Sequence, residues 1–313
     1  MTVLKISLFG TVQISHNDWV SSTKVAPKAL ALLSYLLLQG HRLHPREVLA
    51  QQLWQDYSEK QARSCLSTAL WRLRLVLEPK PIHRGTYLVV TTSDEIGFNW
   101  HSNYWLDCAI FESQARAIIK YPLSPISNRT IEKLEETLRL YTGDLLESLY
   151  DDWAVREKQR LNYLYLDCLE YLMRYYRQVG YYERSLAYGQ QILAQEPIRE
   201  AIHREMIRLY LETGQRALAV RQYQLCQEIL SQELGLEPMA ETQALYDDAR
   251  HGSEKNGLSA AQTNLQQAFS QLNLAAKGFD DAQQQLKLAQ SRFDQAQLKL
   301  QRALQMVERL TNL

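Results

Sequence analysis

The feature that most constrains the fold is a repetition of 34 residues in the middle of the chain. Gly180 and Gly214 lie 34 residues apart, and "GYYERSLAYGQ" and "GQRALAVRQYQ" begin equivalent helical patterns after them. This period is typical of tetratricopeptide helix pairs. Successive amphipathic segments with short breaks extend from Leu106 to about Arg250. The sequence therefore predicts a mainly α-helical protein with a central tetratricopeptide-like array.

The first hundred residues follow a different pattern. The alternation in "VLKISLF" and "TVQIS" predicts a small antiparallel hairpin near the N-terminus. Helical patterns then follow over residues 27–39, 45–54 and 59–77, with Pro27 in a first-turn position and Gly40 as a stop. Residues 87–100 alternate on both sides of a turn at Ser93–Asp94, which again predicts a hairpin. This order predicts an α+β winged helix-turn-helix with an extra N-terminal sheet.

The last part of the chain carries a heptad pattern. Apolar residues recur every seven positions, and alanine usually follows each by three positions. Eight unbroken heptads predict one long, left-handed coiled-coil helix that needs a partner. The first positions of these heptads, which we expect to drive self-association, are Leu258, Leu265, Leu272, Phe279, Leu286, Phe293, Leu300 and Val307. The predicted domains are 1–102 (winged helix), 103–250 (helical array), 251–257 (linker) and 258–313 (coiled coil).

Charge is unevenly distributed along a neutral chain. Residues 1–86 hold 11 lysines and arginines against 5 aspartates and glutamates, a net of +6, and the remainder holds 24 against 30. A basic first quarter indicates a local anionic partner. The four cysteines are isolated and are expected to be reduced, buried thiols: Cys65, Cys108, Cys168 and Cys226. With no signal peptide or membrane span in view, we expect a cytoplasmic protein.

Motifs for catalysis, cofactors and metals are absent from the sequence. It has no Gly-rich phosphate loop, no G-x-S-x-G elbow and no H-E-x-x-H pattern. The seven histidines form no ligand spacing, and His203 is interpreted as a packed helix residue. We therefore expect neither an enzyme nor a bound metal or cofactor.

The helix predicted over residues 59–77 has an unusual outer face. Ala62, Leu66, Leu70, Leu73 and Leu77 form an apolar stripe, as on most surface helices. The opposite face of residues 62–77 carries small hydroxyls, a tryptophan and arginines, and no acid. In a winged helix, the helix before the wing enters the major groove of DNA, where slim side chains and arginines reach base edges and phosphates. This helix is therefore predicted to be a DNA-recognition helix.

The predicted DNA contacts come from this helix, the wing and two helix starts. The wing (residues 83–100) begins with "HRGTY", in which Arg84 lies beside a glycine, and Lys28 and Arg46 are placed to contact the flanking phosphates. An alternative is that Trp71 packs inward and the arginines are merely solvated. The complete predicted set is Arg63, Ser64, Ser67, Thr68, Trp71, Arg72, Arg74, Arg84, Lys28 and Arg46.

Several motifs together resemble the bacterial transcriptional activator family of the Streptomyces antibiotic regulatory protein type. They are "LFGTVQIS" (8–15), "KALALLSYLLLQG" (28–40), "HPREVLAQQLW" (44–54), "ARSCLSTALWRLR" (62–74), "LDCAIFE" (106–112), "LYTGDLLE" (140–147), "DDWAVREKQRL" (151–161), "EPIREAIHREMIRLYLETGQRALAVRQY" (196–223) and "LGLEP" (234–238). The resemblance covers residues 3–250. It implies an OmpR-like winged helix followed by a bacterial transcriptional activation domain.

The resemblance also implies a function. Family members bind promoter direct repeats, often as two protomers, and activate through RNA polymerase; by family position, Arg63, Ser67, Trp71 and Arg74 face the groove. The chain departs from larger members, because it has no phosphate loop and nothing like a phosphothreonine-reading domain. The coiled coil is outside the family pattern. Its role as a homodimer contact rests on periodicity alone, with intramolecular packing or a different protein partner as alternatives.

A second function class remains open at this point. The helical array is rich in tyrosine, so the protein could be a scaffold or sensor that grips a peptide, with the winged helix docking protein instead of DNA. Tyrosine at helical spacing is more often part of a repeat core, which places this hypothesis second. The array tyrosines in question are Tyr163, Tyr165, Tyr171, Tyr175, Tyr176, Tyr181 and Tyr182.

Overall fold

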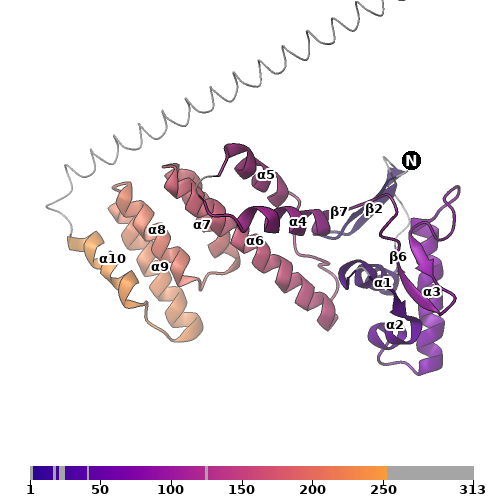
Figure 1. The fold of residues 1–313 in the computed structure, drawn as a ribbon. Coiled ribbons are helices and arrows are strands. Elements are labelled where there is room, and N and C mark those ends of the chain that lie inside the picture. The colour runs from indigo at the N-terminus through magenta and orange to yellow at the C-terminus, as the bar shows by residue number, and fades with distance from the viewer. Residues whose placement is uncertain (1–2, 17–18, 21–24, 41, 124–125, 252–313) are drawn as a thin grey trace, which may run out of the picture. The chain divides into compact units, whose positions relative to one another are not determined.

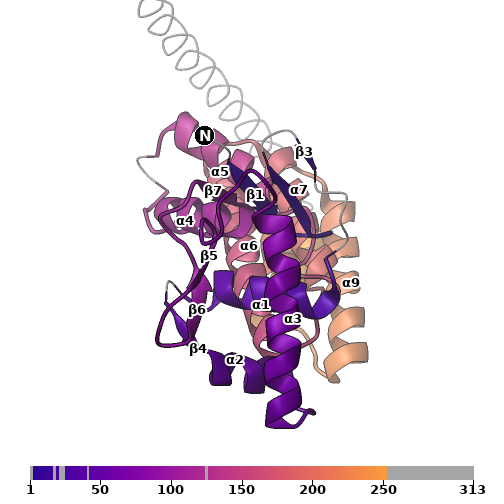
Figure 2. The ribbon, with the colours of Figure 1, turned by 90° about the vertical axis from the view of Figure 1, so that its right-hand side faces the viewer.

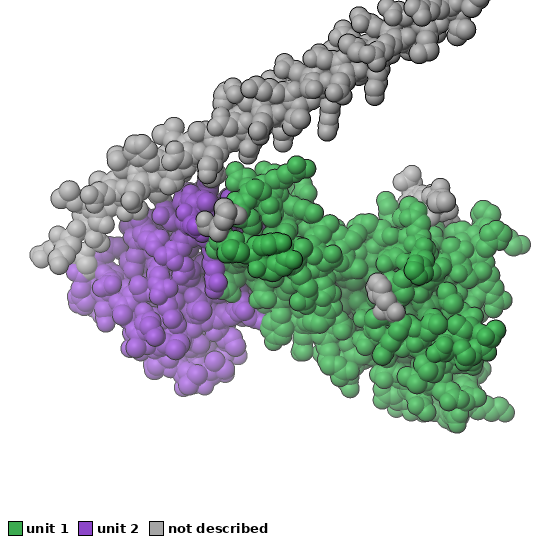
Figure 3. Space-filling view, in the orientation of Figure 1, with its two compact units in different colours: residues 1–171 green, residues 172–313 purple. Residues whose placement is uncertain are grey.

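A computed structural model describes residues 3–16, 19–20, 25–40, 42–123 and 126–251. The chain divides into two compact units, residues 1–171 and 172–313 (Figure 3). The domain boundary predicted at residues 102 and 103 falls inside the first unit. The predicted coiled coil, residues 258–313, lies outside the described residues.

The first unit begins with a small sheet in the strand order β3-β2-β1-β7. The predicted N-terminal hairpin is confirmed, since β1 (Leu4–Ser7) and β2 (Gln13–His16) pair antiparallel with Ile6 opposite Ile14. β3 (Trp19–Val20) extends this hairpin. β7 (Tyr104–Leu106) pairs parallel with β1 on its other edge. The sequence did not reveal β7, because a three-residue strand has no periodicity of its own.

The predicted winged-helix order is also confirmed (Figure 1). Its helices are α1 (Pro27–Leu38), α2 (Arg46–Leu53) and α3 (Glu59–Leu77). A second sheet has the order β4-β6-β5, with β4 at His44–Pro45, β5 at Leu88–Val90 and β6 at Glu95–Phe98. Figure 2 looks onto α3, with this sheet beside it. β5 and β6 form the antiparallel hairpin predicted for the wing.

Helix α3 is fixed by its ends and by its apolar stripe. At its start, the side-chain oxygen of Gln61 accepts the backbone N–H of Ser58 at 3.2 Å, which caps one of the first-turn donors. Its buried residues are Ala62, Leu66, Ala69, Leu70, Leu73, Val76 and Leu77. This is the stripe that the sequence predicts, and it holds α3 against the core of the winged helix.

A buried carboxylate joins the N-terminal sheet to the helices that follow. Asp107 is the first residue of α4 (Asp107–Ile119), and its side chain accepts the backbone N–H groups of Leu8, Phe9 and Cys108 at 2.7–3.0 Å. Burial raises the pKa of Asp107, while these N–H groups act in the opposite direction by stabilising the ionised form. Three otherwise unpaired donors thus depend on one side chain.

Two motifs of the sequence, "LFGTVQIS" (8–15) and "LYTGDLLE" (140–147), meet at the same place. Phe9 forms an isolated bridge with Leu145, and the N–H of Gly10 donates to the carbonyl of Asp144 at 2.9 Å. A side chain at Gly143 would come within 3.1 Å of the Gly10 backbone, so this close approach requires glycine. The Phe9 ring packs on Phe111 and on the ring of Tyr141. α5 (Asn128–Leu138) packs on α4 nearby.

The second unit contains the predicted helical repeat. α6 (Asp152–Gln178) runs from the first unit into the second, where it is followed by α7 (Tyr182–Gln195), α8 (Glu200–Glu212), α9 (Arg216–Leu234) and α10 (Ala240–His251). The turns before α7 and α9 are equivalent. Tyr181 N–H donates to the Tyr176 carbonyl at 2.8 Å, and Gln215 N–H donates to the Tyr210 carbonyl at 2.7 Å. The donor and the acceptor of the first bond each lie 34 residues before their counterparts in the second, so the 34-residue period is confirmed in the backbone.

The interpretation of His203 as a packed helix residue is confirmed. It is buried, with Nε2 at 2.8 Å from the carbonyl of Pro197 and Nδ1 at 2.7 Å from the amide nitrogen of Gln222. Nε2 therefore donates and Nδ1 accepts, which fits the neutral ring. Burial lowers the pKa of His203, against the weaker effect of its hydrogen bonds. A neutral, fully partnered imidazole in the core has no ligand role here.

The cysteine prediction holds for three of the four residues. Cys108, Cys168 and Cys226 are buried free thiols, and burial raises the pKa of each. Cys65 is only half-buried, which corrects the expectation for that residue. It lies beside the apolar stripe of α3, on the edge between the core and the outer face.

Within the described residues, no helix is both long enough and apolar enough to span a membrane.

Replacing Asp107 tests its role in the first unit. Asp107→Ala leaves three buried N–H groups without their acceptor, at about 1–3 kcal/mol for each unsatisfied group. We expect the free energy of unfolding of this unit to fall by at least about 2 kcal/mol, and Asp107→Asn to cost less because its amide oxygen still accepts. Denaturant titration measures both. The control is Asp56→Ala, an exposed carboxylate, which should change stability little; equal losses in Asp56→Ala and Asp107→Ala would contradict the assignment.

Candidate nucleic-acid interface

The outer face of α3 lies open to solvent, as predicted. Trp71 is 60% exposed and Leu75 is 54% exposed, so the alternative that Trp71 packs inward is wrong. The remaining exposed members of the predicted set on this helix are Arg63, Ser64, Ser67, Thr68 and Arg72. Leu75, one turn after Trp71 on the same face, was not among the predicted contacts.

The hydroxyl groups of this face are bound to the helix itself. Ser67 Oγ donates to the carbonyl of Arg63 at 2.9 Å, and Thr68 Oγ1 donates to the carbonyl of Ser64 at 3.1 Å. These bonds from residue i to residue i−4 are common for hydroxyls within helices. They occupy the hydroxyl protons and leave oxygen lone pairs facing outward.

The arginines of α3 differ in their surroundings. Arg63 forms ion pairs with Glu47 of α2 and with Glu59, one turn earlier on α3. The predicted absence of acid therefore does not hold at this end of the helix, since Glu47 reaches it from a neighbouring element. Arg72 is exposed on the opposite shoulder and has no ion pair among the described residues.

The two positively charged residues predicted at helix starts lie in different places. Arg46, at the start of α2, donates to Asp94 at 2.7 Å in the turn of the wing and to Ser67 Oγ at 3.4 Å. It thus bridges α3 and the wing. Lys28 donates instead to the carbonyl of Leu53 at 3.0 Å, at the end of α2, and its Nζ lies 3.6 Å from Asp151. The structure brings Arg46 to the face of α3 but not Lys28.

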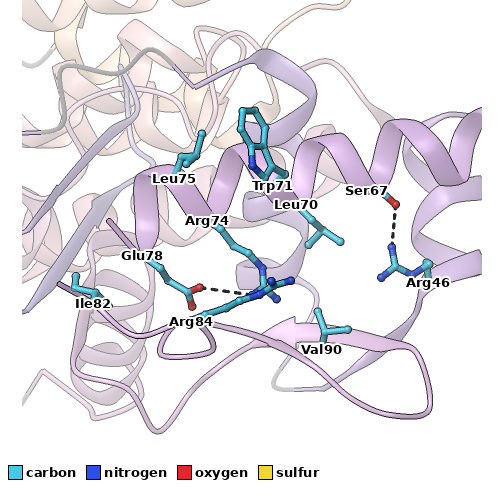
Figure 4. A pocket seen from close by; sticks show the side chains of 10 residues that line it. All are labelled: Arg46, Ser67, Leu70, Trp71, Arg74, Leu75, Glu78, Ile82, Arg84 and Val90. Carbon is cyan, nitrogen blue, oxygen red and sulfur yellow. Dashed lines mark hydrogen bonds and ion pairs between the residues drawn. The ribbon is translucent and has the colours of Figure 1, made fainter. Parts of the chain in front are cut away.

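A cleft of about 410 Å³ lies between α3 and the wing (Figure 4). Its walls combine three arginines and one glutamate with the outer side chains of α3 and two apolar residues of the wing region. The lining residues are Arg46, Ser67, Leu70, Trp71, Arg74, Leu75, Glu78, Ile82, Arg84 and Val90. Four predicted residues of α3 and the wing, namely Ser67, Trp71, Arg74 and Arg84, therefore share one surface.

Glu78 fixes the wing to the end of α3. Its carboxyl is 2% exposed, and Oε1 accepts the backbone N–H groups of Gly85, Tyr87 and Leu88 at 2.9–3.0 Å. Oε2 lies 3.9 Å from Nη1 of Arg74. Glu78 is not among the predicted site residues, because a glutamate at a helix end before Pro79 carries no sign that it will be buried.

Arg74 is held in a positively charged environment. Its side chain is 15% exposed; burial and then the charge of Arg84 lower the pKa of Arg74, while Glu78 acts in the opposite direction. Arginine nevertheless keeps its charge in proteins. Two guanidinium groups beside one carboxylate leave a net positive charge at the cleft, which suits an anionic ligand.

The described residues contain no group of three or more His, Cys, Asp or Glu side chains arranged to hold a metal ion. The candidate site is built from cations, hydroxyls and exposed apolar side chains.

Comparison with known proteins shows which regulators the chain resembles. The family of the bacterial transcriptional activator domain matches residues 106–250. The chain is 26% identical over 243 residues to the regulatory protein AfsR of Streptomyces coelicolor, covering 77% of this chain and 24% of that protein. It is 23% identical to the regulatory protein DnrI of Streptomyces peucetius, covering 81% of this chain and 96% of that protein.

The chain contains a bacterial transcriptional activator domain and is similar to regulators of the Streptomyces antibiotic regulatory protein type. It spans about a quarter of the length of the AfsR relatives. It is also 25% identical to the transcriptional regulatory protein MoaR1 of Mycobacterium tuberculosis, covering 70% of this chain and 71% of that protein.

A solved structure shares the fold of this chain. It is Mycobacterium tuberculosis EmbR in complex with a low-affinity phosphopeptide, with a TM-score of 0.65 and 18% identity. The similarity covers 88% of this chain and 72% of EmbR. At this identity the comparison establishes the fold alone.

Glu78 gives a direct test of how the site is assembled. In Glu78→Ala the N–H groups of Gly85, Tyr87 and Leu88 lose their acceptor. We therefore expect hydrogen exchange at these amides to accelerate by about 5- to 13-fold, because one hydrogen bond contributes about 1–1.5 kcal/mol. Glu78→Gln keeps an accepting oxygen and should exchange more slowly than Glu78→Ala. Exposed Glu47→Ala is the control; unchanged exchange in Glu78→Ala would show that the wing is held by other contacts.

Proposed function

We propose that this regulator binds promoter DNA in a sequence-specific manner through α3 and the wing. The observation that carries the proposal is the shared surface of Trp71, Arg74 and Arg84 around one cleft, with Arg72 exposed on the other shoulder of α3. An α-helix fits the major groove, and arginines around it bind phosphates or guanine edges. Similarity to transcriptional regulators supports the same conclusion.

Activation is the second part of the proposal. The bacterial transcriptional activator domain at residues 106–250 supports activation through RNA polymerase. Binding to promoter direct repeats by two protomers would place two such domains side by side on the DNA.

Identification of bound fragments across the genome tests DNA binding and yields the target sequence. Bound fragments without a common sequence would contradict sequence-specific binding.

The scaffold hypothesis is less well supported. Of the seven array tyrosines considered, only Tyr163 is largely exposed, whereas Tyr175 and Tyr176 are buried. Tyr176 stacks on Tyr188 with ring centroids 5.7 Å apart. Most of these tyrosines are thus packed between the helices, as a repeat core requires, and offer little exposed surface for binding a peptide.

Removing cations from the proposed interface should weaken DNA binding. Arg72→Ala and Arg84→Ala are each expected to reduce affinity for the bound fragment, and a lost phosphate contact should lower the slope of log K against log salt by about 1. A contact to a base edge would instead cost about 1–3 kcal/mol and relax the sequence preference. The matched control is Arg129→Ala, an exposed arginine on α5. Equal affinity of all three variants and the unaltered protein would remove these residues from the interface.

The heptad segment is proposed to set the oligomeric state. Apolar residues at eight successive heptads, from Leu258 to Val307, suit a parallel or antiparallel homodimer. Sedimentation of the full chain should therefore show a dimer, and a variant that ends at residue 251 should be a monomer. A monomer in both forms would contradict the proposal, and so would a dimer in both.

A further inference from the structure

The polar groups on the outer face of α3 are largely engaged within the protein. Ser67 and Thr68 direct their hydroxyl protons to carbonyls of their own helix, and Ser67 Oγ also accepts from Arg46. Arg63 is paired with Glu47 and Glu59. Most polar atoms of base edges in the major groove are acceptors, namely N7 and O6 of guanine, N7 of adenine and O4 of thymine. A face whose hydroxyl protons are already donated is poorly equipped to read them.

Apart from Ser64 and, on the shoulder of the helix, Arg72, the unengaged side chains of this face are apolar. Trp71 and Leu75 lie four residues apart on the same side of α3, and both are more than half exposed. Residues at this spacing are neighbours on a helix, so they form one continuous surface. Val90, which is 38% exposed, adds an apolar side chain from the wing across the cleft. Adjacent exposed apolar side chains that line a cleft form a candidate surface for binding a ligand.

The surrounding charge identifies the kind of ligand. Arg46, Arg74 and Arg84 line the same cleft as Trp71 and Leu75 (Figure 4). An apolar protein partner would not need three guanidinium groups around its docking site, whereas DNA presents phosphates beside its grooves. Thymine is distinguished from the other unmodified bases by a methyl group on the major-groove edge. The cleft therefore combines the two chemistries that a thymine-containing duplex offers.

We propose that Trp71 and Leu75 read thymine through its C5 methyl group, by apolar contact, while the arginines around them bind the flanking backbone. This inference rests on the proposed function and deepens it, since it names the feature of the DNA that gives this helix its specificity. It assigns the main discrimination to shape and burial instead of hydrogen bonds from Ser64, Ser67 and Thr68.

The test uses a duplex recovered from genome-wide binding, with thymines replaced one at a time by deoxyuridine. This change removes only the C5 methyl group. We expect one or two replacements to weaken binding of the full chain by about fourfold each, the value of one buried methyl group, and the others to have little effect. Trp71→Ala should bind more weakly and should no longer distinguish thymine from uracil at the position that Trp71 reads. Tyr163→Ala, an equally exposed aromatic change on α6, should retain the distinction.

The outcomes separate this inference from the proposed function. If the full chain binds no recovered duplex, DNA binding itself is wrong. If it binds and every uracil replacement is neutral, methyl reading is wrong while DNA binding stands. If both Trp71→Ala and Leu75→Ala still distinguish thymine from uracil as the unaltered protein does, the inference is also wrong. DNA binding that neither variant affects would overturn it too. Circular dichroism of each variant establishes that the fold is intact.

Discussion

The buried carboxylate of Asp107 is the interaction on which the first unit depends. It accepts N–H groups from Leu8 and Phe9 at the end of β1 and from Cys108 at the start of α4. Beside it, β7 pairs with β1, and the segment around Asp144 pairs with Gly10. The N-terminal sheet and the first helices of the activator domain consequently share one core, centred on the rings of Phe9, Phe111 and Tyr141. The winged helix is thereby attached by packed structure in addition to the chain connection.

The second constraint operates at α3, where one helix serves two purposes. Its inner stripe, from Ala62 to Leu77, is buried against the winged-helix core. Its outer face and the cleft beside it carry cations and exposed apolar side chains, and Glu78 holds the wing in place through three backbone hydrogen bonds. The same helix thus positions the wing and presents the surface proposed to bind DNA. A binding surface supported in this way is arranged before the ligand arrives, which reduces the ordering cost of binding.

The sequence predicts the parts of this structure that have local periodicity. The stripe of α3, the 34-residue period and both hairpins follow from patterns within short windows, and each is confirmed. Contacts between distant residues were not predictable in the same way. β7 is too short for a pattern, Glu47 reaches Arg63 only through tertiary structure, and the burial of Asp107 and Glu78 has no local signature. The exposure of Trp71 was likewise decided by the fold, because helical spacing alone allowed either orientation.

The outer face of α3 and the wing are proposed to form the DNA-binding surface. The most direct measurement is the structure of the full chain bound to a promoter duplex. The account predicts α3 in the major groove, with Trp71 and Leu75 against base edges and Arg84 within hydrogen-bonding distance of a phosphate. DNA bound to a different surface, or an outer face of α3 covered by protein, would contradict it.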